Sequence, residues 1–598
     1  MAIVVPSPES VKNLPVALSE KQRIVAETLL DVLSQHPHSR VLLWATLFIL
    51  QVIGLPQTVV ATWFGCSTRN VRHINRQVRS ICRGDGKTGR PPKAETIPLE
   101  AMPSVIGYSA YAGLWLLLPG LLTSRLLQFT QLLAFLTPVA GLAPWQWVLT
   151  VLVLAWLGFS RLHHLRDLCD VGVALFTGRS KVLDANRARK AMKAIPCQAG
   201  QRFYQATAQA EWETIPDACP WVSVDEHTVG HQGGPEMPQS KVPRFGRIRR
   251  AHRLFGTFVL GVRRFVGLIV TQADRCLCHV ATGQLTEARR HQARVQPQSV
   301  GLRSILDRGS YRAETHQALQ ALRDQGVQYL ALARRTQKNV AYWDTLVCTG
   351  LLELHPYTHH HDLALPPEQR RDHFFLGTCQ TPLTFKPEGQ KKKETMWVPT
   401  ILIVDETKLF DEDRKHKYVA AFFGTLDLPP GLQAQVYPSR QEHELAYRDV
   451  IHALGFDALP KGYLKRSPDR PLNDAAQETV LETKNIFLLS WLRLWAYNRV
   501  TQFLAHLPQA YHRLTVVTAA RKFLRRPGLL LLEKDSLVVR LDPFPDQAAL
   551  SDYIAWINER RLAIPWLSGL VLRIEIADKP AAQTAPPTKW RKLLSAPT

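Results

Sequence analysis

The sequence lacks the features that mark secreted and membrane proteins. Its nine cysteines form no disulfide framework, so we expect reduced thiols in a cytoplasmic protein. The first nine residues contain no basic region leading into an apolar run, and we expect no signal peptide. The apolar stretches 113–122 and 147–159 are shorter than the ~20 residues of a membrane-spanning helix. The sequence therefore predicts no membrane association.

Acidic residues are scarce relative to basic ones. The chain has 74 Lys and Arg against 50 Asp and Glu, which gives a formal net charge of +24. An excess of this size attracts polyanions over a long range and predicts a nucleic-acid partner. With 598 residues, 46% of them hydrophobic and 21% charged, the chain is expected to fold into several globular domains.

The order of expected elements divides the chain into five regions. They are a helix-turn-helix domain with a basic linker (1–95), a second, apolar helical domain (96–200), a core of strands and helices (201–333 and 426–510), a β-rich insertion (334–425), and a C-terminal α/β region with a disordered tail (511–598). Strands and helices that follow one another as they do in the core are typical of a mixed sheet covered by helices. The predicted fold class is multidomain α+β.

Residues 55–78 have the pattern of two short helices joined by a tight turn. Gly65 suits the left-handed conformation of such a turn, and Ser67 or Thr68 can cap the second helix. In a helix-turn-helix the second helix enters the major groove of DNA. A plain helical hairpin has the same pattern. The candidate DNA-contacting residues near the start of the second helix are Thr68, Arg69, Asn70, Arg72 and His73.

Two aspartates directly follow short apolar runs that we expect to be buried strands. Asp225 follows residues 221–224, and Asp307 follows residues 304–306. This placement puts each carboxylate at the tip of a strand, where a site can form. Oxygen ligands of this kind suit Mg²⁺ or Mn²⁺ rather than zinc.

A third acid belongs to a helical pattern later in the chain. Tyr437, Arg440 and Glu444 are three and four residues apart, so they share one face if the helix reaches Tyr437. Arginine and tyrosine beside a metal-binding glutamate are suited to holding a phosphate. Acids that converge from distant positions usually hold two divalent metals for phosphoryl transfer, so Asp225, Asp307 and Glu444 are the candidate catalytic and metal-binding residues. Glu442 is an alternative third acid.

A basic segment follows the first aspartate. Residues 241–264 contain eight Lys and Arg and no acid, and we expect them to line DNA near the site. The candidates in this segment are Arg247, Arg249 and Arg250. Two runs of metal-ligand residues lack partners at zinc-finger spacing, so we expect no metal there. They are the Cys-Leu-Cys-His run at 276–279 and the three histidines at 359–361, which we interpret as an exposed loop.

These motifs resemble those of the DDE transposases of bacterial insertion sequences, in the group with a Y-R-E signature. Residues 222–225 resemble the first-Asp strand, and residues 306–311 resemble the second-Asp motif. The similarity extends over about residues 220–500. The signature corresponds to Tyr437, Arg440 and Glu444, with Tyr447, the candidate phosphate ligand Arg448, and Asn498 as further counterparts. Gln441 stands where a tryptophan is usual and Ile451 where a lysine is usual.

The resemblance implies an RNase H-like catalytic core that holds two Mg²⁺ or Mn²⁺ ions. It implies metal-dependent strand cleavage at terminal inverted repeats of double-stranded DNA, and then strand transfer into target DNA. A homodimer or larger synaptic complex, associated with the bacterial nucleoid, is expected on the same ground. Two alternatives stay open, namely an RNase H-like nuclease without strand transfer and a non-enzymatic helix-turn-helix DNA-binding protein.

Overall fold

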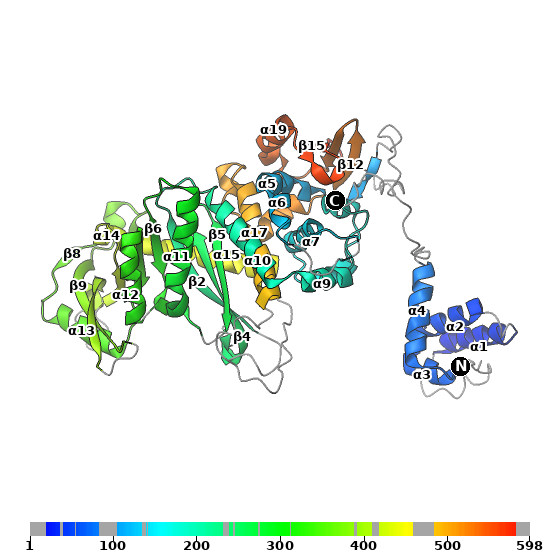
Figure 1. The fold of residues 1–598 in the computed structure, drawn as a ribbon, viewed down its shortest axis with the longest axis horizontal. Helices are drawn as coiled ribbons and strands as arrows, with labels where there is room; N and C mark the ends of the chain where they lie inside the picture. Colours follow the sequence, from blue (N-terminus) through cyan, green and yellow to red (C-terminus); the bar gives the residue numbers. More distant parts are fainter. Residues whose placement is uncertain are drawn as a thin grey trace. The chain divides into compact units, whose positions relative to one another are not determined.

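The chain divides into two compact units, Met1–Glu95 and Thr96–Thr598 (Figure 1). The computed structural model describes residues 19–35, 40–53, 55–82, 105–133, 139, 141–230, 239–242, 246–272, 275–310, 312–387, 392–408, 418–458 and 483–581. The expected basic linker after residue 82 and most of the expected disordered tail lie outside these ranges. Within them, no helix combines the length and the apolar character needed to cross a membrane.

Four helices make up the described part of the first unit. They are α1 (Glu20–Gln35), α2 (Arg40–Val52), α3 (Gln57–Trp63) and α4 (Thr68–Cys82). Leu30, Leu50 and Val60 are fully buried between them. The turn between α3 and α4 contains Gly65 at φ 58°, a left-handed conformation that glycine adopts without strain. The Ser67 hydroxyl accepts a hydrogen bond from the Asn70 N–H at 3.2 Å and so caps α4.

The second unit is built around a mixed sheet. Its first strands are β2 (Trp221–Gly230), β3 (Gln239–Val242), β4 (Arg247–Val259), β5 (Arg264–Gln272), β6 (Leu302–Leu306) and β7 (Val327–Leu332). β4 is antiparallel to both β2 and β5. β6 is parallel to β2, and β7 is parallel to β6. The sheet therefore runs β5-β4-β2-β6-β7. β3 pairs antiparallel with the first residues of β4.

The segment expected to be an insertion extends this same sheet. It contains α13 (Gln337–Cys348), β8 (Leu354–Pro356), β9 (Phe374–Phe385), β10 (Glu394–Asp405) and β11 (Tyr418–Gly424). β11 pairs antiparallel with β7 through Phe422 and Leu332. The order then continues through β10, β9 and β8.

Helices cover both faces of the sheet. They are α10 (Cys197–Trp212), α11 (Leu277–Val295), α12 (Ala313–Ala321), α14 (Pro430–Val436), α15 (Gln441–Leu454) and α17 (Thr483–Leu504). Alternate residues of a strand point to opposite faces. On β4, Phe255 packs in the cluster that contains Leu285 of α11, and Leu254 and Phe258 pack in the cluster that contains Trp491 of α17. The same strand thus anchors two helical layers (Figure 1).

A second sheet brings the two ends of this unit together. Its strands run in the order β1 (Val105–Ser109), β12 (Gly528–Glu533), β13 (Ser536–Leu541), β15 (Leu570–Ile576) and β14 (Ala563–Ile564). β1 pairs antiparallel with β12, so the region expected to be entirely helical begins with a strand. The remaining helices around this sheet are α5 (Leu118–Thr123), α6 (Leu126–Thr130), α7 (Pro144–Trp156), α8 (Val171–Phe176), α9 (Ala185–Ala194), α18 (Val516–Ala519) and α19 (Ser551–Arg560).

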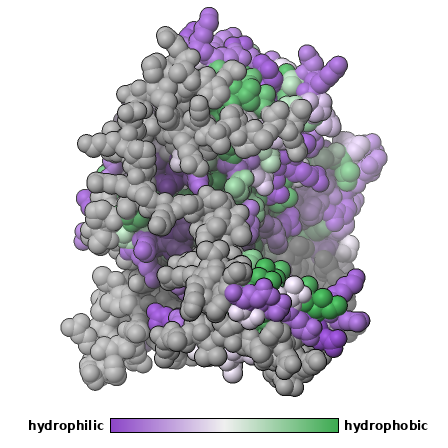
Figure 2. All heavy atoms as spheres, turned by 90° about the vertical axis from the view of Figure 1, so that its right-hand side faces the viewer, coloured by the Kyte–Doolittle hydropathy of each residue, from purple (hydrophilic) through white to green (hydrophobic). Residues whose placement is uncertain are grey.

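One face of the molecule is drawn in Figure 2. The coloured residues there are mostly hydrophilic, and the hydrophobic ones form small separate groups.

Asn498 hydrogen-bonds the backbone of β5 along the edge that does not pair with β4. Its side-chain amide donates to the Phe265 carbonyl and its side-chain oxygen accepts from the Phe265 N–H, both at 2.8 Å. The side chain is fully buried. Asn498→Leu leaves both backbone groups unsatisfied, and we expect it to lower the free energy of unfolding by about 2–4 kcal/mol. Urea denaturation followed by circular dichroism measures this change.

The exposed Gln509 offers the control for this prediction, since Gln509→Ala should change the same free energy by less than ~0.5 kcal/mol. An unchanged midpoint for Asn498→Leu would show that the edge of β5 does not depend on this side chain.

Candidate active site

The pairing of β2 with β6 brings the two aspartates side by side. The parallel register ends with Val224 opposite Leu306, and the next residues along the two strands are Asp225 and Asp307. Asp225 does not end its strand, as the sequence had suggested, because β2 continues to Gly230 in pairing with β4. Only the pairing with β6 stops at this point. Because β6 ends at Leu306, the carboxylates of Asp225 and Asp307 lie just beyond its end, where they can approach one another.

Arg440 links all three predicted acids. It ends the 3₁₀ turn Tyr437–Arg440, directly before α15. Its Nη1 donates to Asp225 Oδ2 at 3.0 Å, and its Nη2 lies 3.9 Å from Asp307 Oδ1. The same Nη2 forms a close ion pair with Glu444 Oε1, one helical turn further on. The structure therefore gathers Asp225, Asp307 and Glu444 around one guanidinium group.

Glu442, the alternative third acid, has a different partner. Its Oε2 accepts a hydrogen bond from the Gly261 N–H at 2.6 Å, in the turn between β4 and β5. Glu444 carries the carboxylate that contacts Arg440. The geometry therefore groups Glu444, and not Glu442, with the two aspartates.

Burial dominates the electrostatics of this site. Asp225 is 9% exposed. Its burial raises the pKa of its carboxyl to about 7, although Arg440 pulls in the opposite direction. Burial alone would lower the pKa of Arg440, but Asp225 and the neighbouring acids raise it above its ordinary value. Because three carboxylates face one guanidinium, the site favours additional positive charge.

The donor set fits a hard divalent cation in its chemistry. Carboxylate oxygens are the ligands that Mg²⁺ and Mn²⁺ prefer. In this structure Arg440 stands between the acids, and their carboxylate oxygens are not all within 4.8 Å of one another. Among the described residues, two other groups of potential metal ligands meet this distance. They are Cys276, Cys278 and His279, and His359 to His361. Ions could be held by Asp225, Asp307 and Glu444 only after Arg440 moves from between them.

Tyr437 lies beside Arg440. Its ring centroid is 6.0 Å from the guanidinium carbon. Its hydroxyl is buried and has no hydrogen-bond partner among the described residues. Burial raises the pKa of this phenol above its ordinary value, so it stays a neutral donor. Arg448, a further turn along α15 from Glu444, is exposed.

Tyr447 supports the strand that carries Asp225. Its buried hydroxyl donates to the Asp225 backbone oxygen at 3.2 Å. Gly256 is the β4 partner of Asp225, and a Cβ there would collide with this hydroxyl, so the close approach requires glycine. His443 stacks on Tyr447 with ring centroids 4.7 Å apart, and burial lowers its pKa well below the ordinary value.

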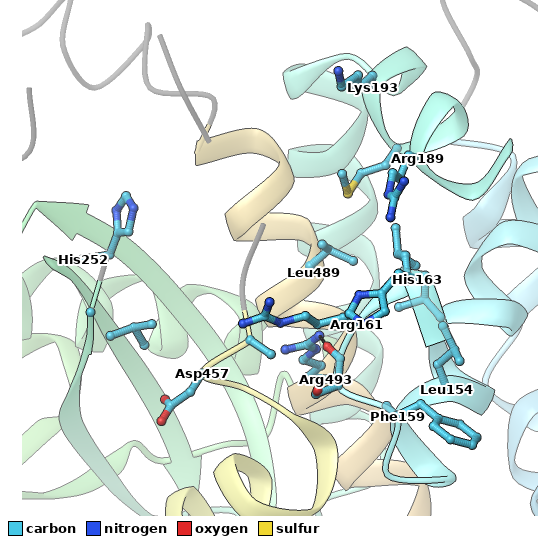
Figure 3. A pocket seen from close by; sticks show the side chains of 18 residues that line it. Leu154, Phe159, Arg161, His163, Arg189, Lys193, His252, Asp457, Leu489 and Arg493 are labelled. Atoms are coloured by element: carbon cyan, nitrogen blue, oxygen red, sulfur yellow. Dashed lines mark hydrogen bonds between the residues drawn. The ribbon is translucent and has the colours of Figure 1, made fainter. Parts of the chain in front are cut away.

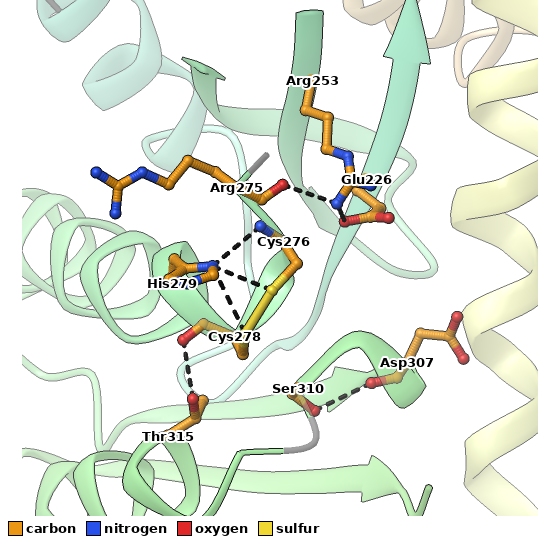
Figure 4. Close-up of a disulfide and its surroundings, with 9 residues drawn as sticks. All are labelled: Glu226, Arg253, Arg275, Cys276, Cys278, His279, Asp307, Ser310 and Thr315. Carbon is orange, nitrogen blue, oxygen red and sulfur yellow. Dashed lines mark hydrogen bonds and ion pairs between the residues drawn. A yellow bond between two sulfur atoms is a disulfide. The ribbon is translucent and has the colours of Figure 1, made fainter. Parts of the chain in front are cut away.

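Sequence reasoning missed a fourth carboxylate, Glu226. Arg253 Nη1 donates to it at 3.4 Å, and burial raises the pKa of its carboxyl. The sequence signal for Glu226 was its position directly after Asp225. Figure 4 shows Glu226 near the start of α11, with Asp307 on the loop after β6.

The expectation of reduced thiols is wrong for one cysteine pair. Cys276 and Cys278 form a disulfide at the start of α11 (Figure 4), with their Cα atoms 5.4 Å apart. Two cysteines separated by one residue come close because the chain turns into the helix at Cys276. The other described cysteines that are free are Cys66, Cys169, Cys219, Cys348 and Cys379.

The three histidines at 359–361 are not a wholly exposed loop. His359 is 9% exposed and packs against Phe374, with ring centroids 4.8 Å apart. Asp362 nearby is held by Arg371 at 2.9 Å. The run is therefore part of the packing around β9.

The basic segment contains both exposed and buried arginines. Arg247 and Arg249 are exposed on β4, and Arg250 lies on the same strand. The last two arginines of the segment are structural instead. Arg263 donates to the His512 carbonyl at 2.6 Å, and Arg264 is buried at 5% exposure. Arg263 and Arg264 are therefore held by contacts within the fold, unlike the exposed Arg247 and Arg249.

In the first unit, α4 separates apolar from polar side chains. Val71 is fully buried and Ile74 is 6% exposed. Arg69 and Arg72 are exposed, and Arg72 Nε donates to the side-chain oxygen of Gln57 at 3.0 Å. The start of α4 thus presents basic side chains to solvent.

No family model matches the chain, and no curated protein matches it. Among solved structures, the chain is similar to a piggyBac transposase in a synaptic complex with hairpin DNA, a cryo-EM structure. The identity is 9%, the match covers 64% of this chain and 71% of that chain, and the TM-score is 0.31. At this TM-score the similarity carries no functional argument.

The raised pKa of Asp225 predicts how stability depends on pH. Because the folded-state pKa, about 7, exceeds the ordinary 3.8, the folded state favours the protonated carboxyl. The charged form therefore costs stability above pH 7, and the cost disappears as the pH falls toward 4. In EDTA, Asp225→Asn should raise the free energy of unfolding by about 2–4 kcal/mol at pH 8 and by far less at pH 4.

Urea denaturation at the two pH values measures this effect. Asp324 is exposed, so Asp324→Asn should leave stability unchanged at both. An Asp225→Asn variant that is less stable than the wild type at pH 8 would contradict the assigned cost of burial.

Proposed function

We propose that this protein is a DDE-type DNA transposase that cleaves the ends of a mobile DNA element and joins them to target DNA. The observation that carries the proposal is the convergence of Asp225, Asp307 and Glu444 on Arg440. These residues come from two neighbouring strands and a helix that are distant in sequence.

The strand order supports the same proposal. Three antiparallel strands, β5, β4 and β2, are followed by the parallel strands β6 and β7. An RNase H-like core has this arrangement, with its acids on the first strand, the fourth strand and a later helix. Asp225 lies on β2, Asp307 directly follows β6 and Glu444 lies on α15, which supports assigning them to those places.

The proposed reaction is an in-line displacement at phosphorus. A water oxygen attacks the scissile phosphate and loses one proton to solvent, while the bond from phosphorus to the 3′ oxygen breaks and that oxygen takes up a proton, which leaves a 5′-phosphate and a 3′-hydroxyl. The freed 3′-hydroxyl then attacks a phosphate of the target, forming a new phosphodiester and releasing the target's own 3′ oxygen. Arg440 is placed to donate to a non-bridging phosphate oxygen, and the neutral Tyr437 hydroxyl is a second donor.

Asp225, Asp307 and Glu444 are the residues that would hold Mg²⁺ or Mn²⁺. Two such ions would supply an activated attacking oxygen and charge stabilisation of the leaving oxygen. Glu226 lies at the edge of these three acids and forms an ion pair with Arg253. Movement of Arg440 toward the phosphate would free the carboxylates, so binding of DNA and of metal are expected to favour one another.

DNA recognition is assigned to the first unit and to β4. Arg69 and Arg72 on α4 are the proposed contacts to the element ends. Arg247, Arg249 and Arg250 on β4, with Arg448 on α15, are the proposed phosphate contacts near the site. Double-stranded DNA is the proposed partner, and pairing of two ends calls for at least a dimer.

Each of Asp225→Asn, Asp307→Asn and Glu444→Gln should abolish Mg²⁺-dependent cleavage while leaving DNA binding intact, because each removes an anionic oxygen ligand. The substrate is the DNA that flanks the gene, in which short inverted repeats bounded by a direct duplication are expected. Gel analysis of labelled ends measures cleavage, and a mobility shift in EDTA measures binding.

Glu442→Gln is the matched control, since Glu442 lies on the same helix and bonds Gly261 instead. If Glu444→Gln still cleaves DNA and Glu442→Gln does not, then Glu442 and not Glu444 is the third metal-binding carboxylate. A DNA substrate with a pre-cut end tests strand joining independently of cleavage. Metal-dependent cleavage without joining would identify an RNase H-like nuclease, and binding without cleavage would identify a non-enzymatic DNA-binding protein.

Arg69→Ala and Arg72→Ala should each reduce the salt dependence of binding to element ends, because each variant lacks one cation that neutralises the DNA backbone. The expected change is ~0.9 in the slope of log K against log salt for each phosphate that is no longer neutralised. Fluorescence anisotropy at several salt concentrations measures the slope. Arg23→Ala, on α1 of the same unit, is the control and should leave it unchanged.

A further inference from the structure

A cavity of about 450 Å³ lies away from the three acids. It opens between the helical block of α7 and α9, the far half of β2, and α17, as Figure 3 shows. Small-molecule pockets have volumes in this range, whereas a bare phosphate needs far less space. The cavity can therefore hold a phosphate together with a larger group.

The floor of the cavity contains a buried cation with spare hydrogen-bonding capacity. Arg493, on α17, is 6% exposed. Its Nη2 donates to the Ser160 carbonyl at 2.6 Å, which fixes the guanidinium. Its Nη1 is buried and has no hydrogen-bond partner among the described residues. Arg493 therefore adds a positive charge to the wall of the cavity.

Further cations surround the opening. Arg161 lies beside Arg493 in Figure 3, and Arg189 and Lys193 line the cavity from α9. Asp457 is the acid among the described lining residues, and it also pairs with His227 at 2.7 Å. Four basic side chains against one carboxylate leave the cavity positively charged, which favours an anion.

The remaining wall is apolar. Leu154 from α7, Met192 from α9 and Leu489 from α17 line it, together with Phe159. A ligand that fills the cavity therefore needs an anionic part and a flat or apolar part. A nucleotide has both, since its phosphate is charged and its base has an apolar face.

We propose that this cavity binds one nucleotide unit of a DNA single strand, with its phosphate against Arg161 and Arg493 and its base against the apolar wall. The inference rests on the proposed function, since it places a strand of the DNA substrate there. β2 connects the two sites, because Asp225 and the lining residue Gly230 are five residues apart, or roughly 16 Å along the strand. A strand a few nucleotides long spans that distance.

The test uses a fluorescein-labelled 12-nucleotide DNA strand and the full chain in EDTA, so that it needs no catalysis. Arg161→Ala with Lys193→Ala should weaken binding about tenfold and reduce the salt slope by ~1.4, which corresponds to two phosphates no longer neutralised. The matched control replaces Arg166 and Lys190, exposed neighbours in the same two elements that do not line the cavity. An equally weakened affinity in both double variants would overturn the proposal.

A second variant fills the cavity without removing charge. Ala458→Trp, in the lining, should weaken binding of the strand while the melting temperature stays within a few degrees of the wild type. Unchanged affinity would show that the strand does not enter the cavity. Deoxyguanosine monophosphate should compete more strongly than inorganic phosphate, and equal competition would overturn the role of the apolar wall.

Glu444→Gln separates this inference from the proposed function. It should bind the strand as the wild type does, because Glu444 does not line the cavity. A wild-type protein that cuts no DNA but shows the cavity-dependent binding would remove the transposase proposal and keep the nucleotide site.

Discussion

The burial of Asp225, which the ion pair with Arg440 offsets only in part, is the constraint on which the candidate site depends. A carboxylate in the middle of a central strand is costly to bury unless it is paired. Arg440 provides that pairing and in doing so fixes the start of α15 against β2. Tyr447 adds a second connection about two turns later, through the backbone oxygen of Asp225. Helix and strand are thus positioned by the same polar contacts that assemble the site.

The length of β6 decides where those contacts form. β6 ends at Leu306, whereas β2 and β4 continue together beyond that level. A longer β6 would satisfy the backbone of β2 on both sides and would bury Asp225 and Asp307 within the sheet. Because it stops, the two carboxylates face an opening into which Arg440 reaches. The site is a consequence of unequal strand lengths within one continuous sheet.

Local pattern predicted the elements well and their contacts poorly. The apolar runs before Asp225 and Asp307 identified the two strands, and the spacing of Arg440 and Glu444 identified a helical pair that the structure contains. Strand continuation past Asp225 depends on β4, whose pairing comes from residues about thirty positions away. The pairing of β1 with β12 joins residues more than four hundred positions apart. No local pattern carries such information.

Net charge likewise predicts a class of partner but not the surface that would bind it. In the basic segment after β2, Arg264 lies within 3.9 Å of Glu211 in the core, while Arg247 is exposed. Arg493 resembles Arg264 in burial, and each has one buried donor without a partner among the described residues, but Arg493 lines a cavity. Burial alone does not distinguish a structural arginine from one that binds a ligand. The distinction lies in the surroundings, because Arg264 packs against Glu211 in the core, whereas Arg493 lines a cavity that an anion can enter.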